Sequence, residues 1–300
     1  MRDVSHKFDT LRTATAQATV RVSPSSIAAI REGRVPKGDP LPVAKVAGIL
    51  AAKNTPLLIP FCHSVALDHV GVDFELGEDR IVVTASAKAV YKTGVEMEAL
   101  TAAAVAALNL YDILKMIDDH LEIEAVTLLD KRGGKSDYKP SVERPLRAAV
   151  LVVSDSVSAG TAQDRSGVAI RERLLAEGMA VDEVRTVPDE PEKIRAFIEG
   201  ASGVDLLVAT GGTGIGPRDR TPEAVEPLLD RRLEGVEEAM RAYGQRRTPY
   251  AMMSRSLAGV RGSCVVLCLP GSTGGVVDCL NAVLPTLAHA TGILRGGGHP

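Results

Sequence analysis

The stretch TGGTGIGPRDRTPEA, residues 210–224, determines the predicted fold class of the second half of this 300-residue chain. It follows an apolar run, residues 204–209, that predicts a buried strand, and it precedes a run, residues 224–229, that predicts a helix. Thr221 is expected to cap this helix, with Pro222 in its first turn. A strand, a glycine loop and a helix N-terminus together form an anion site, usually for phosphate. A tight turn alone would need fewer than four glycines, so we interpret the stretch as a ligand loop.

The glycine loop matches neither of the two common nucleotide-binding motifs. Gly216 is followed by Pro-Arg and not by Lys-Ser/Thr, which excludes a Walker A loop. The glycine spacing also differs from the dinucleotide fingerprint. The ligand class therefore has to come from other residues.

Two further segments of the second half repeat the order of apolar strand, polar glycine loop and helix. Their apolar runs are AAVLVV (148–153) and CVVLCL (264–269). Apolar strands interleaved with helices predict a mostly parallel sheet covered by helices on both faces. Ligands bind such sheets at the carboxyl ends of the strands. We expect one site at that edge, formed by Ser154, Asp155, residues 211–219 and residues 270–274.

The first half predicts a different architecture, an α+β sandwich of strands packed under helices. The expected strands are residues 13–22, 70–76, 81–90 and 121–129, and the expected helices are residues 24–32, 42–53 and 95–117. The polar stretch RGGKSDYKPSVERP, residues 132–145, has the composition of a boundary. We therefore predict a first domain at 1–140, a linker at 141–146 and a second domain at 147–300.

Composition excludes several classes of protein. The formal net charge is −3 and aromatic residues make up 3% of the chain, so nucleic-acid binding is not expected. The N-terminus has no apolar core typical of a signal peptide, and no apolar run is long enough for a bilayer, so we expect no membrane association and a cytoplasmic location. The cysteines form no CxxC pair, which argues against a zinc ribbon. These cysteines are Cys62, Cys264, Cys268 and Cys279.

The predicted helix TGVEMEALTAAAVAALNLYDILK, residues 93–115, carries polar groups that helical periodicity places on one face. Glu98 and Asp112 are nevertheless 14 positions apart, about 21 Å along a helix, and cannot both contact one small ligand within one subunit. Two subunits related by symmetry could bring the two ends together. An amphipathic helix with solvated ends is the alternative interpretation. The residues on this face are Met97, Glu98, Asp112 and Lys115.

The first half resembles the cyclic pyranopterin monophosphate synthase family. The resemblance covers residues 1–139 and rests on the motifs VSHKFDTLRTATA, KGD, AGILAAKNT, LIPFCHS, KTGVEMEALTAAAVAALNLYD and KRGGKSD. It implies a ferredoxin-like fold, a homo-oligomer (a trimer or hexamer) and sites between subunits. It also implies a reaction that converts a cyclic dihydroguanosine triphosphate into cyclic pyranopterin monophosphate and pyrophosphate, with no cofactor. The sequence departs from the family pattern at Ser64, Arg132 and Asp137.

The same resemblance assigns the residues of this first site. Lys115 with Asp112 would form an acid/base pair, with the pKa of the lysine lowered by burial. Lys37, Lys131 and His63 would neutralise the phosphates. The remaining residues implied to bind substrate are Phe61, Cys62, Glu96, Met97 and Glu98.

The second half, roughly residues 146–300, resembles the molybdopterin-binding family that adenylylates molybdopterin. The motifs are SDSVSAGTAQDRSG, PDEPEKIRAFI, TGGTGIGPRDRTPEAV, TPYAMMSRSLAGV and LPGSTGG. The resemblance implies that Asp219 and Asp189 act through Mg²⁺ on ATP. It also implies a pocket for nucleotide and pterin lined by Ser154, Asp155, Gly211, Gly212, Thr213, Ser254, Pro270, Gly271 and Ser272.

The family of the second half contains both active adenylyltransferases and relatives of doubtful activity. A non-enzymatic module that binds pterin and oligomerises is therefore the alternative for this half. For the whole chain, a fusion that only raises the local concentration of pathway enzymes is a third interpretation. The polar residues expected in both halves are present, which argues against it.

Overall fold

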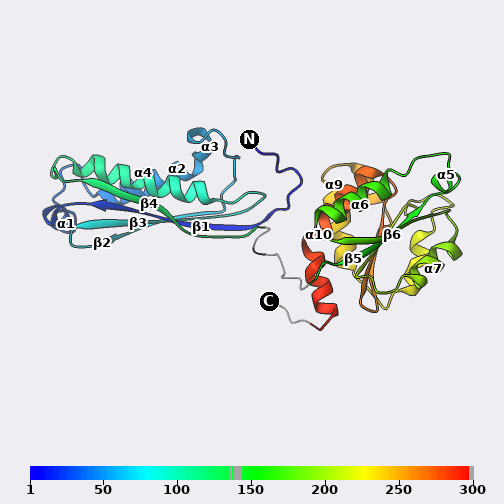
Figure 1. The fold of residues 1–300 in the computed structure, drawn as a ribbon. Helices are drawn as coiled ribbons and strands as arrows, with labels where there is room; N and C mark the ends of the chain where they lie inside the picture. Colours follow the sequence, from blue (N-terminus) through cyan, green and yellow to red (C-terminus); the bar gives the residue numbers. More distant parts are fainter. Residues whose placement is uncertain (135–136, 138–143, 297–300) are drawn as a thin grey trace. The chain divides into compact units, whose positions relative to one another are not determined.

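The computed structural model of the 300-residue chain describes residues 1–134, 137 and 144–296, which form two compact units (Figure 1). Unit 1 is Met1–Asp137 and unit 2 is Tyr138–Pro300. The boundary between the units lies three residues before the predicted linker at 141–146, whose first three residues fall outside the described part of the chain. Its last residues belong to unit 2, because Leu146 is buried and Arg144 forms an ion pair with Asp205.

Unit 1 is an antiparallel sheet with helices on one face (Figure 1). Its strands follow the order β2-β3-β1-β4, and neighbouring strands are antiparallel throughout. This is the order of a ferredoxin-like sandwich, so the predicted fold class is confirmed. Its elements are β1 (Thr10–Arg21), α1 (Pro24–Arg31), α2 (Pro40–Lys53), α3 (Thr55–Leu58), β2 (His69–Leu76), β3 (Arg80–Tyr91), α4 (Glu96–Leu114) and β4 (Glu122–Arg132).

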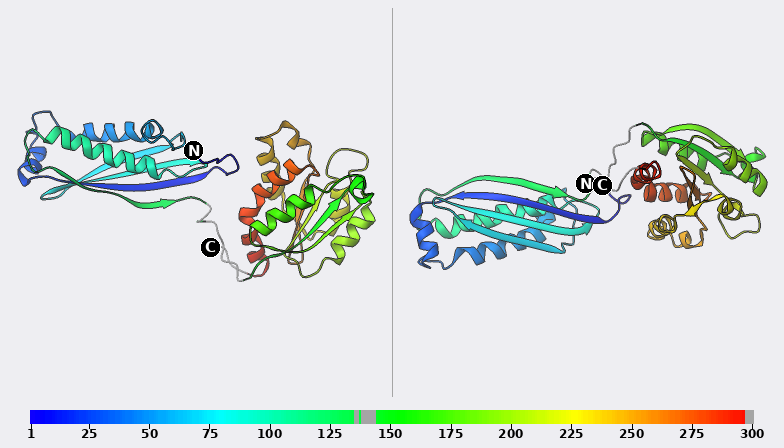
Figure 2. Two further views of the ribbon diagram at one scale, coloured as in Figure 1. Left: turned by 45° about the horizontal axis from the view of Figure 1, so that its top comes forward. Right: turned by 90° about the horizontal axis from the view of Figure 1, so that it is seen from below.

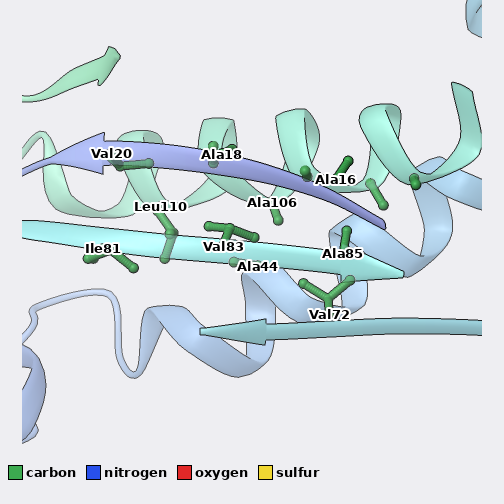
Figure 3. Packing of buried hydrophobic residues seen from close by; sticks show 14 of the residues in the cluster. Ala16, Ala18, Val20, Ala44, Val72, Ile81, Val83, Ala85, Ala106 and Leu110 are labelled. Carbon is green, nitrogen blue, oxygen red and sulfur yellow. The ribbon is translucent and has the colours of Figure 1, made fainter. Parts of the chain in front are cut away.

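Small buried side chains, many of them alanines, allow the helices of unit 1 to pack close to its sheet (Figure 3). Alternate residues of β1, namely Ala14, Ala16, Ala18 and Val20, are buried against the alanines of α4. Helix α2 approaches α4 so closely that a side chain at Gly48 would lie 2.9 Å from the carbonyl oxygen of Ala102. Helix α2 also begins two residues earlier than predicted, because the Asp39 carboxylate accepts a hydrogen bond from the N–H of Leu41.

Unit 2 is a six-stranded sheet between two layers of helices (Figure 2). The order is β6-β5-β7-β10-β9-β8, and the first four strands are parallel, as predicted. Strand β5 is buried on both faces: Leu151 joins the core under α7, whereas Val152 faces Gly167 of α6. Its elements are β5 (Arg147–Val153), α5 (Asp155–Ser158), α6 (Ser166–Ala176), β6 (Ala180–Val187), α7 (Pro191–Gly200), β7 (Leu206–Thr210), α8 (Thr221–Val225), η1 (Glu226–Leu228), β8 (Arg231–Arg232), α9 (Glu234–Gln245), η2 (Pro249–Met253), β9 (Leu257–Arg261), β10 (Cys264–Leu269) and α10 (Thr273–Leu294).

The helix predicted after the glycine loop differs from the helix observed there. Thr221 is the first helical residue and not the cap, and its hydroxyl donates to the carbonyl oxygen of Gly211 at 2.8 Å. Helix α8 ends at Val225 and continues as the 3₁₀ turn η1, because Pro227 lacks the N–H that an α-helix needs. The Thr221 hydroxyl therefore connects the end of the glycine loop to its start at Gly211. The N-terminus of α8 has no side-chain cap.

Helix α4 corrects one expectation about membranes. Within the described part of the chain it is the one helix that is long and apolar enough, by length and composition, to cross a membrane. The sequence had suggested that no run was long enough. Because α2 and the sheet cover α4, we interpret its apolar character as that of a core helix.

Candidate active sites

The first cluster of polar residues lies at the C-terminal end of α4. Lys37 Nζ is 3.0 Å from Asp112 Oδ2, and Lys115 Nζ is 2.7 Å from Asp112 Oδ1. Hydrogen bonds from Lys115 and then Lys37 hold the pKa of Asp112 below its usual value. The Asp112 carboxylate in turn raises the pKa of Lys115, whose side chain is 54% exposed. The expectation of a lowered lysine pKa is therefore wrong for the single chain, because Asp112 stabilises the charged lysine and the side chain is more than half exposed.

A second cluster lies at the N-terminal end of the same helix. Lys131 Nζ is 3.3 Å from Glu96 Oε1, and the Glu96 carboxylate folds back over Gly94, where any side chain would collide with it. Glu98 is buried, and burial raises its pKa, with a further contribution from the Glu96 carboxylate. Burial and then Glu98 raise the pKa of the nearby Cys62 thiol. The predicted residues of this end thus form one continuous group.

The loop before β2 and the tip of α4 supply the other predicted residues. Phe61 is 79% exposed and Met97 is 38% exposed, so both apolar side chains are accessible from solvent. His63 Nε2 lies 2.9 Å from the carbonyl oxygen of Arg2, so the N-terminal segment of the chain reaches this loop.

Arg12 is a residue of this region that sequence reasoning did not single out. Its guanidinium donates to the carbonyl oxygens of Tyr91 and Lys92, both at 3.2 Å, and to that of Gly133. It therefore fixes the ends of β3 and β4 beside the second cluster. The signal was present in the quoted motif LRTATA, as a charged residue within an alternating strand.

The two clusters are at opposite ends of a 19-residue helix. At 1.5 Å per residue the ends of α4 are about 27 Å apart. Unit 1 therefore keeps Asp112 and Glu98 apart. Their spacing in the sequence had predicted this separation. The two also differ in environment, since Glu98 is buried and Asp112 is exposed, whereas periodicity had placed them on one face.

In unit 2, the loops after β5 and β6 are joined by their aspartates. The N–H of Asp155 donates to the Asp189 carboxylate at 2.9 Å, and the N–H of Asp189 donates to the Asp155 carboxylate at 3.0 Å. Arg218, from the glycine loop, pairs with Asp155 at 2.7 Å and holds the pKa of Asp155 below its usual value. Ser154 caps the short helix α5. Three loops that are far apart in the sequence thus meet. The parallel sheet predicted this for the loops after β5 and β7, whereas Asp189 in the loop after β6 was implied only by the family resemblance.

The glycine loop is packed too closely for side chains. Gly211 has φ = +100°, and a Cβ there would lie 2.0 Å from the carbonyl oxygen of Val153. A Cβ at Gly271 would lie 3.3 Å from Gly211, so the loop after β10 abuts the loop after β7. The hydroxyl of Thr210 donates to the carbonyl oxygen of Pro270 at 2.8 Å and fixes this contact. Gly212 and Thr213 continue the loop, and Thr213 is buried.

Asp219 is enclosed by the second half of the loop. Its Oδ2 accepts a hydrogen bond from the N–H of Gly216 at 2.7 Å, and a Cβ at Gly214 or Gly216 would lie 2.8 Å from the same oxygen. Burial raises the pKa of Asp189, and the carboxylates of Asp155 and Asp219 add to this shift. Arg218 opposes this shift but does not cancel it, so the negative charges of this edge are only partly neutralised by the chain itself.

The carboxylates fit a Mg²⁺ ion that arrives with a nucleotide better than a resident metal. Mg²⁺ is usually held by one or two carboxylates together with phosphate oxygens. Asp189 and Asp219 meet that requirement. Among the described residues, no group of three or more His, Cys, Asp or Glu side chains could hold a metal ion.

Two pockets flank this edge. The first, of about 430 Å³, lies beside α9 and contains the predicted residues Ser254, Pro270 and Ser272; we call it the α9 pocket. Sequence reasoning missed its charged residues Arg241, Arg247 and Asp278; the side chains of Arg247 and Asp278 are 3.4 Å apart. Arg241 is on α9, Arg247 is in the turn after α9 and Asp278 is on α10. These positions gave no local signal, because only the fold brings α9 and α10 together.

The second pocket, of about 520 Å³, lies beside the glycine loop; we call it the loop pocket. It contains Asp219, Arg220, Glu223 and Arg255. Arg255 was not predicted, although it follows Ser254 directly in a quoted motif. An arginine between two serines in an extended segment was the available signal.

Comparison with known proteins identifies both units. Residues 1–134 match the MoaC family, and residues 149–289 match a family described as a probable molybdopterin binding domain. Over its whole length the chain is 46% identical to the molybdenum cofactor biosynthesis bifunctional protein of Chlorobaculum tepidum, covering 96% of that protein, and 39% identical to that of Synechococcus elongatus, covering 98%. Unit 1 alone is similar to the cyclic pyranopterin monophosphate synthase of Novosphingobium aromaticivorans, with 52% identity over 45% of this chain and 87% of the synthase.

Proposed function

The chain belongs to the family of bifunctional molybdenum cofactor biosynthesis proteins, and we propose that each of its two units catalyses one step of that synthesis. Unit 1 forms cyclic pyranopterin monophosphate from a cyclic dihydroguanosine triphosphate and releases pyrophosphate. Unit 2 binds molybdopterin and transfers an adenylyl group to it from ATP. Sulfur has to be inserted into the pterin between these two steps, so the product of unit 1 is not the substrate of unit 2.

The observation that carries the proposal for unit 1 is the division of its polar residues between the two ends of α4. A site for a triphosphate needs several cations, and Lys37, Lys115 and Lys131 are divided between two clusters. We propose that the C-terminal cluster of one copy meets the N-terminal cluster of another copy. The site is then complete only in an oligomer, such as a trimer or a hexamer.

In such a shared site the exposed lysines would be covered by the partner copy. Lys115 and Asp112 would exchange the proton on the pterin, and coverage by the partner would oppose the raised pKa of Lys115 in the single chain. Lys37, Lys131 and His63 would neutralise the triphosphate and the leaving pyrophosphate. Phe61, Cys62, Met97 and Glu98 would contact the ring system.

The proposal for unit 2 rests on the close approach of Asp155, Asp189, Arg218 and Asp219 at the edge of the sheet. Asp189 and Asp219 would hold Mg²⁺ on the ATP phosphates, where the ion would neutralise charge that develops during transfer. The N–H groups of the glycine loop would bind phosphate oxygens. Ser254, Pro270 and Ser272 line the α9 pocket, which we assign to the pterin, and Gly271 lies in the loop between the last two.

Non-enzymatic pterin binding is the second candidate function of unit 2. One observation favours it: the Asp219 carboxylate already accepts a hydrogen bond from Gly216 and is enclosed by glycines, as a purely structural loop residue would be. Under this alternative the α9 pocket would bind molybdopterin and ATP would not react.

The experiment that tests the proposal is to incubate the full chain with each substrate in turn. The cyclic triphosphate should yield cyclic pyranopterin monophosphate without added metal. Molybdopterin, ATP and Mg²⁺ should yield adenylylated molybdopterin and pyrophosphate. Molybdopterin binding without adenylylation would instead support the binding module.

A further inference from the structure

The segment Ser254–Ser256 runs between the two pockets of unit 2 and faces both. Ser254 and Ser256 line the α9 pocket, with their hydroxyl oxygens 2.8 Å apart, whereas Arg255 lines the loop pocket. This alternation follows from extended backbone, in which successive side chains point in opposite directions. One three-residue segment therefore forms a wall of each pocket.

Arg255 binds the glycine loop through a fork of hydrogen bonds. Its Nε donates to the carbonyl oxygen of Gly214 at 2.7 Å, and its Nη2 donates to that of Asp219. Its own backbone N–H donates to the carbonyl oxygen of Thr213 at 2.9 Å. The two side-chain acceptors are at the start and at the end of the turn that encloses the Asp219 carboxylate. A single planar guanidinium thus sets the width of that turn.

Glu223 holds the fork in place from the first turn of α8. Arg255 Nη1 forms an ion pair with the Glu223 carboxylate. Burial would raise the pKa of Glu223, but the hydrogen bond and the charge of Arg255, together with a backbone hydrogen bond and the charge of Arg220, leave the pKa below its usual value. Glu223 is therefore ionised at neutral pH and keeps the guanidinium directed at the loop.

The turn itself has little packing of its own. Ile215 at its tip is 71% exposed, and Gly216 and Pro217 are exposed as well. No apolar cluster therefore fixes residues 215–217. The hydrogen bonds of Arg255 replace the packing that would otherwise define the position of Asp219.

We propose that Arg255 is a positioning residue for adenylyl transfer, which fixes the turn around Asp219 and links it through Ser254 and Ser256 to the α9 pocket. The inference rests on the proposed function of unit 2. Arg255 does not contact the reacting atoms. It sets where the Asp219 carboxylate stands relative to the phosphates.

The test compares Arg255→Lys and Arg255→Gln in the full chain with Arg261→Lys as a matched control. Arg261 lies at the end of the same strand region and also donates to a backbone carbonyl, that of Ile198, but lines neither pocket. Lysine keeps the charge at position 255 but cannot donate to two carbonyls and a carboxylate in one plane. Initial rates with molybdopterin, ATP and Mg²⁺ give kcat and KM, and hydrogen exchange reports on the amides of residues 213–219 other than Pro217, which has none.

We expect Arg255→Lys to lower kcat by about 10²-fold, since a misplacement of about 1 Å costs that much, and Arg255→Gln to lower it further. KM for molybdopterin should stay within about two-fold, because the serine walls of the α9 pocket remain. Exchange should quicken at residues 213–219 and not in β7. Arg261→Lys should leave kcat and this exchange unchanged.

Several results would overturn the inference. One is an Arg255→Gln variant with the kcat of the wild type. Another is a loss of kcat accompanied by faster exchange throughout unit 2, which would mark a general structural role. A wild-type chain that transfers no adenylyl group contradicts the proposed function itself, and the positioning role with it. An active wild type with unaffected Arg255 variants contradicts the positioning role alone.

Discussion

At the scale of single residues, Asp219 combines a structural contact with the chemical role that we propose for it. Its Oδ2 accepts from the N–H of Gly216, while Asp189 and Asp155 bring further negative charge to the same edge. A carboxylate beside bound phosphates is repelled unless a cation lies between them. The substitution Asp219→Asn separates the effect of the charge from that of the hydrogen bond, because asparagine is neutral but keeps an oxygen that can accept from the N–H of Gly216.

Asp219→Asn should lower the rate of adenylyl transfer by about 10²–10³-fold and leave molybdopterin binding nearly unchanged. The dependence of the rate on Mg²⁺ concentration should weaken as well. Steady-state kinetics and equilibrium pterin binding measure these effects. Normal turnover, or loss of binding with an unchanged chemical step, would show that Asp219 only shapes the loop, and would favour the binding module.

In unit 1, Lys115 is the charged residue that we propose to take part in the reaction, as Asp219 is in unit 2. Lys115→Ala should reduce formation of cyclic pyranopterin monophosphate by about 10²–10⁴-fold, because it removes half of the proposed acid/base pair. The fold should persist, since the side chain is 54% exposed. Lys45→Ala is the control, because Lys45 is an exposed lysine that pairs with Asp73 and, within the described part of the chain, with no residue of either cluster. Product formation and circular dichroism test both expectations, and a fully active Lys115 variant would contradict the assignment.

At the scale of elements, Asp205 connects the start of strand β7 by hydrogen bonds to the first and the last described segments of unit 2. This buried residue, which immediately precedes β7, accepts hydrogen bonds from Arg144, from the N–H of Arg147 and from Arg295. Burial alone would raise the pKa of Asp205, but these donors outweigh it and hold the pKa below the usual 3.8. One carboxylate thus attaches both the segment before β5 and the end of α10 to the sheet.

Asp205→Asn should destabilise unit 2 by about 1–3 kcal/mol at pH 7, because charged hydrogen bonds to a buried acceptor are weakened. A carboxylate with a lowered pKa in the folded state stabilises above its unfolded pKa and loses that contribution as the pH falls through its folded pKa. The difference between variant and wild type should therefore shrink below about pH 4.

Asp182→Asn is the matched control for Asp205→Asn, because Asp182 also pairs with Arg147 but on the surface, where an ion pair contributes less than about 1 kcal/mol. Denaturant unfolding of the full chain, followed by hydrogen exchange of the β7 amides, measures both variants. Equal destabilisation by the two substitutions would refute the fastening role.

At the scale of the whole molecule, the length of α4 underlies the proposal that the first reaction needs more than one copy of the chain. The two clusters of unit 1 are separated by about 27 Å, the length of the helix. A symmetric oligomer places identical surfaces against one another and can bring opposite ends of two helices together. Activity should therefore be a property of the assembly.

A mixture of inactive variants tests this directly. Lys115→Ala damages the C-terminal cluster and Lys131→Ala damages the N-terminal cluster, so co-refolded copies should regain intact sites in about a quarter of cases by random mixing. A mixture of Lys115→Ala with Lys37→Ala, which damage the same cluster, should stay inactive. The absence of complementation in the first mixture, or a monomeric and fully active residue 1–139 fragment in solution scattering, would contradict the shared site.

The sequence by itself determined the class of both units and most of their elements. Alternation in residues 13–22 predicts a strand with one buried face, and the observed β1 buries Ala14, Ala16, Ala18 and Val20. The unbroken apolar run at 264–269 predicts a strand covered on both faces, and β10 is buried over Val265–Leu269. Such patterns are local, because the burial of one face or of both faces of an element sets the spacing of apolar residues within that element alone.

Tertiary structure alone decided which side chains meet and in what environment. Thr221 looked like a cap but closes the loop on Gly211, and Lys115 looked like a buried base but is exposed in the single chain. Arg255 carried no predicted role, yet its fork holds the turn around Asp219. Hydrogen bonding and burial depend on neighbours distant in the sequence. A local pattern therefore fixes where an element runs, and only the packed chain fixes what each polar group contacts.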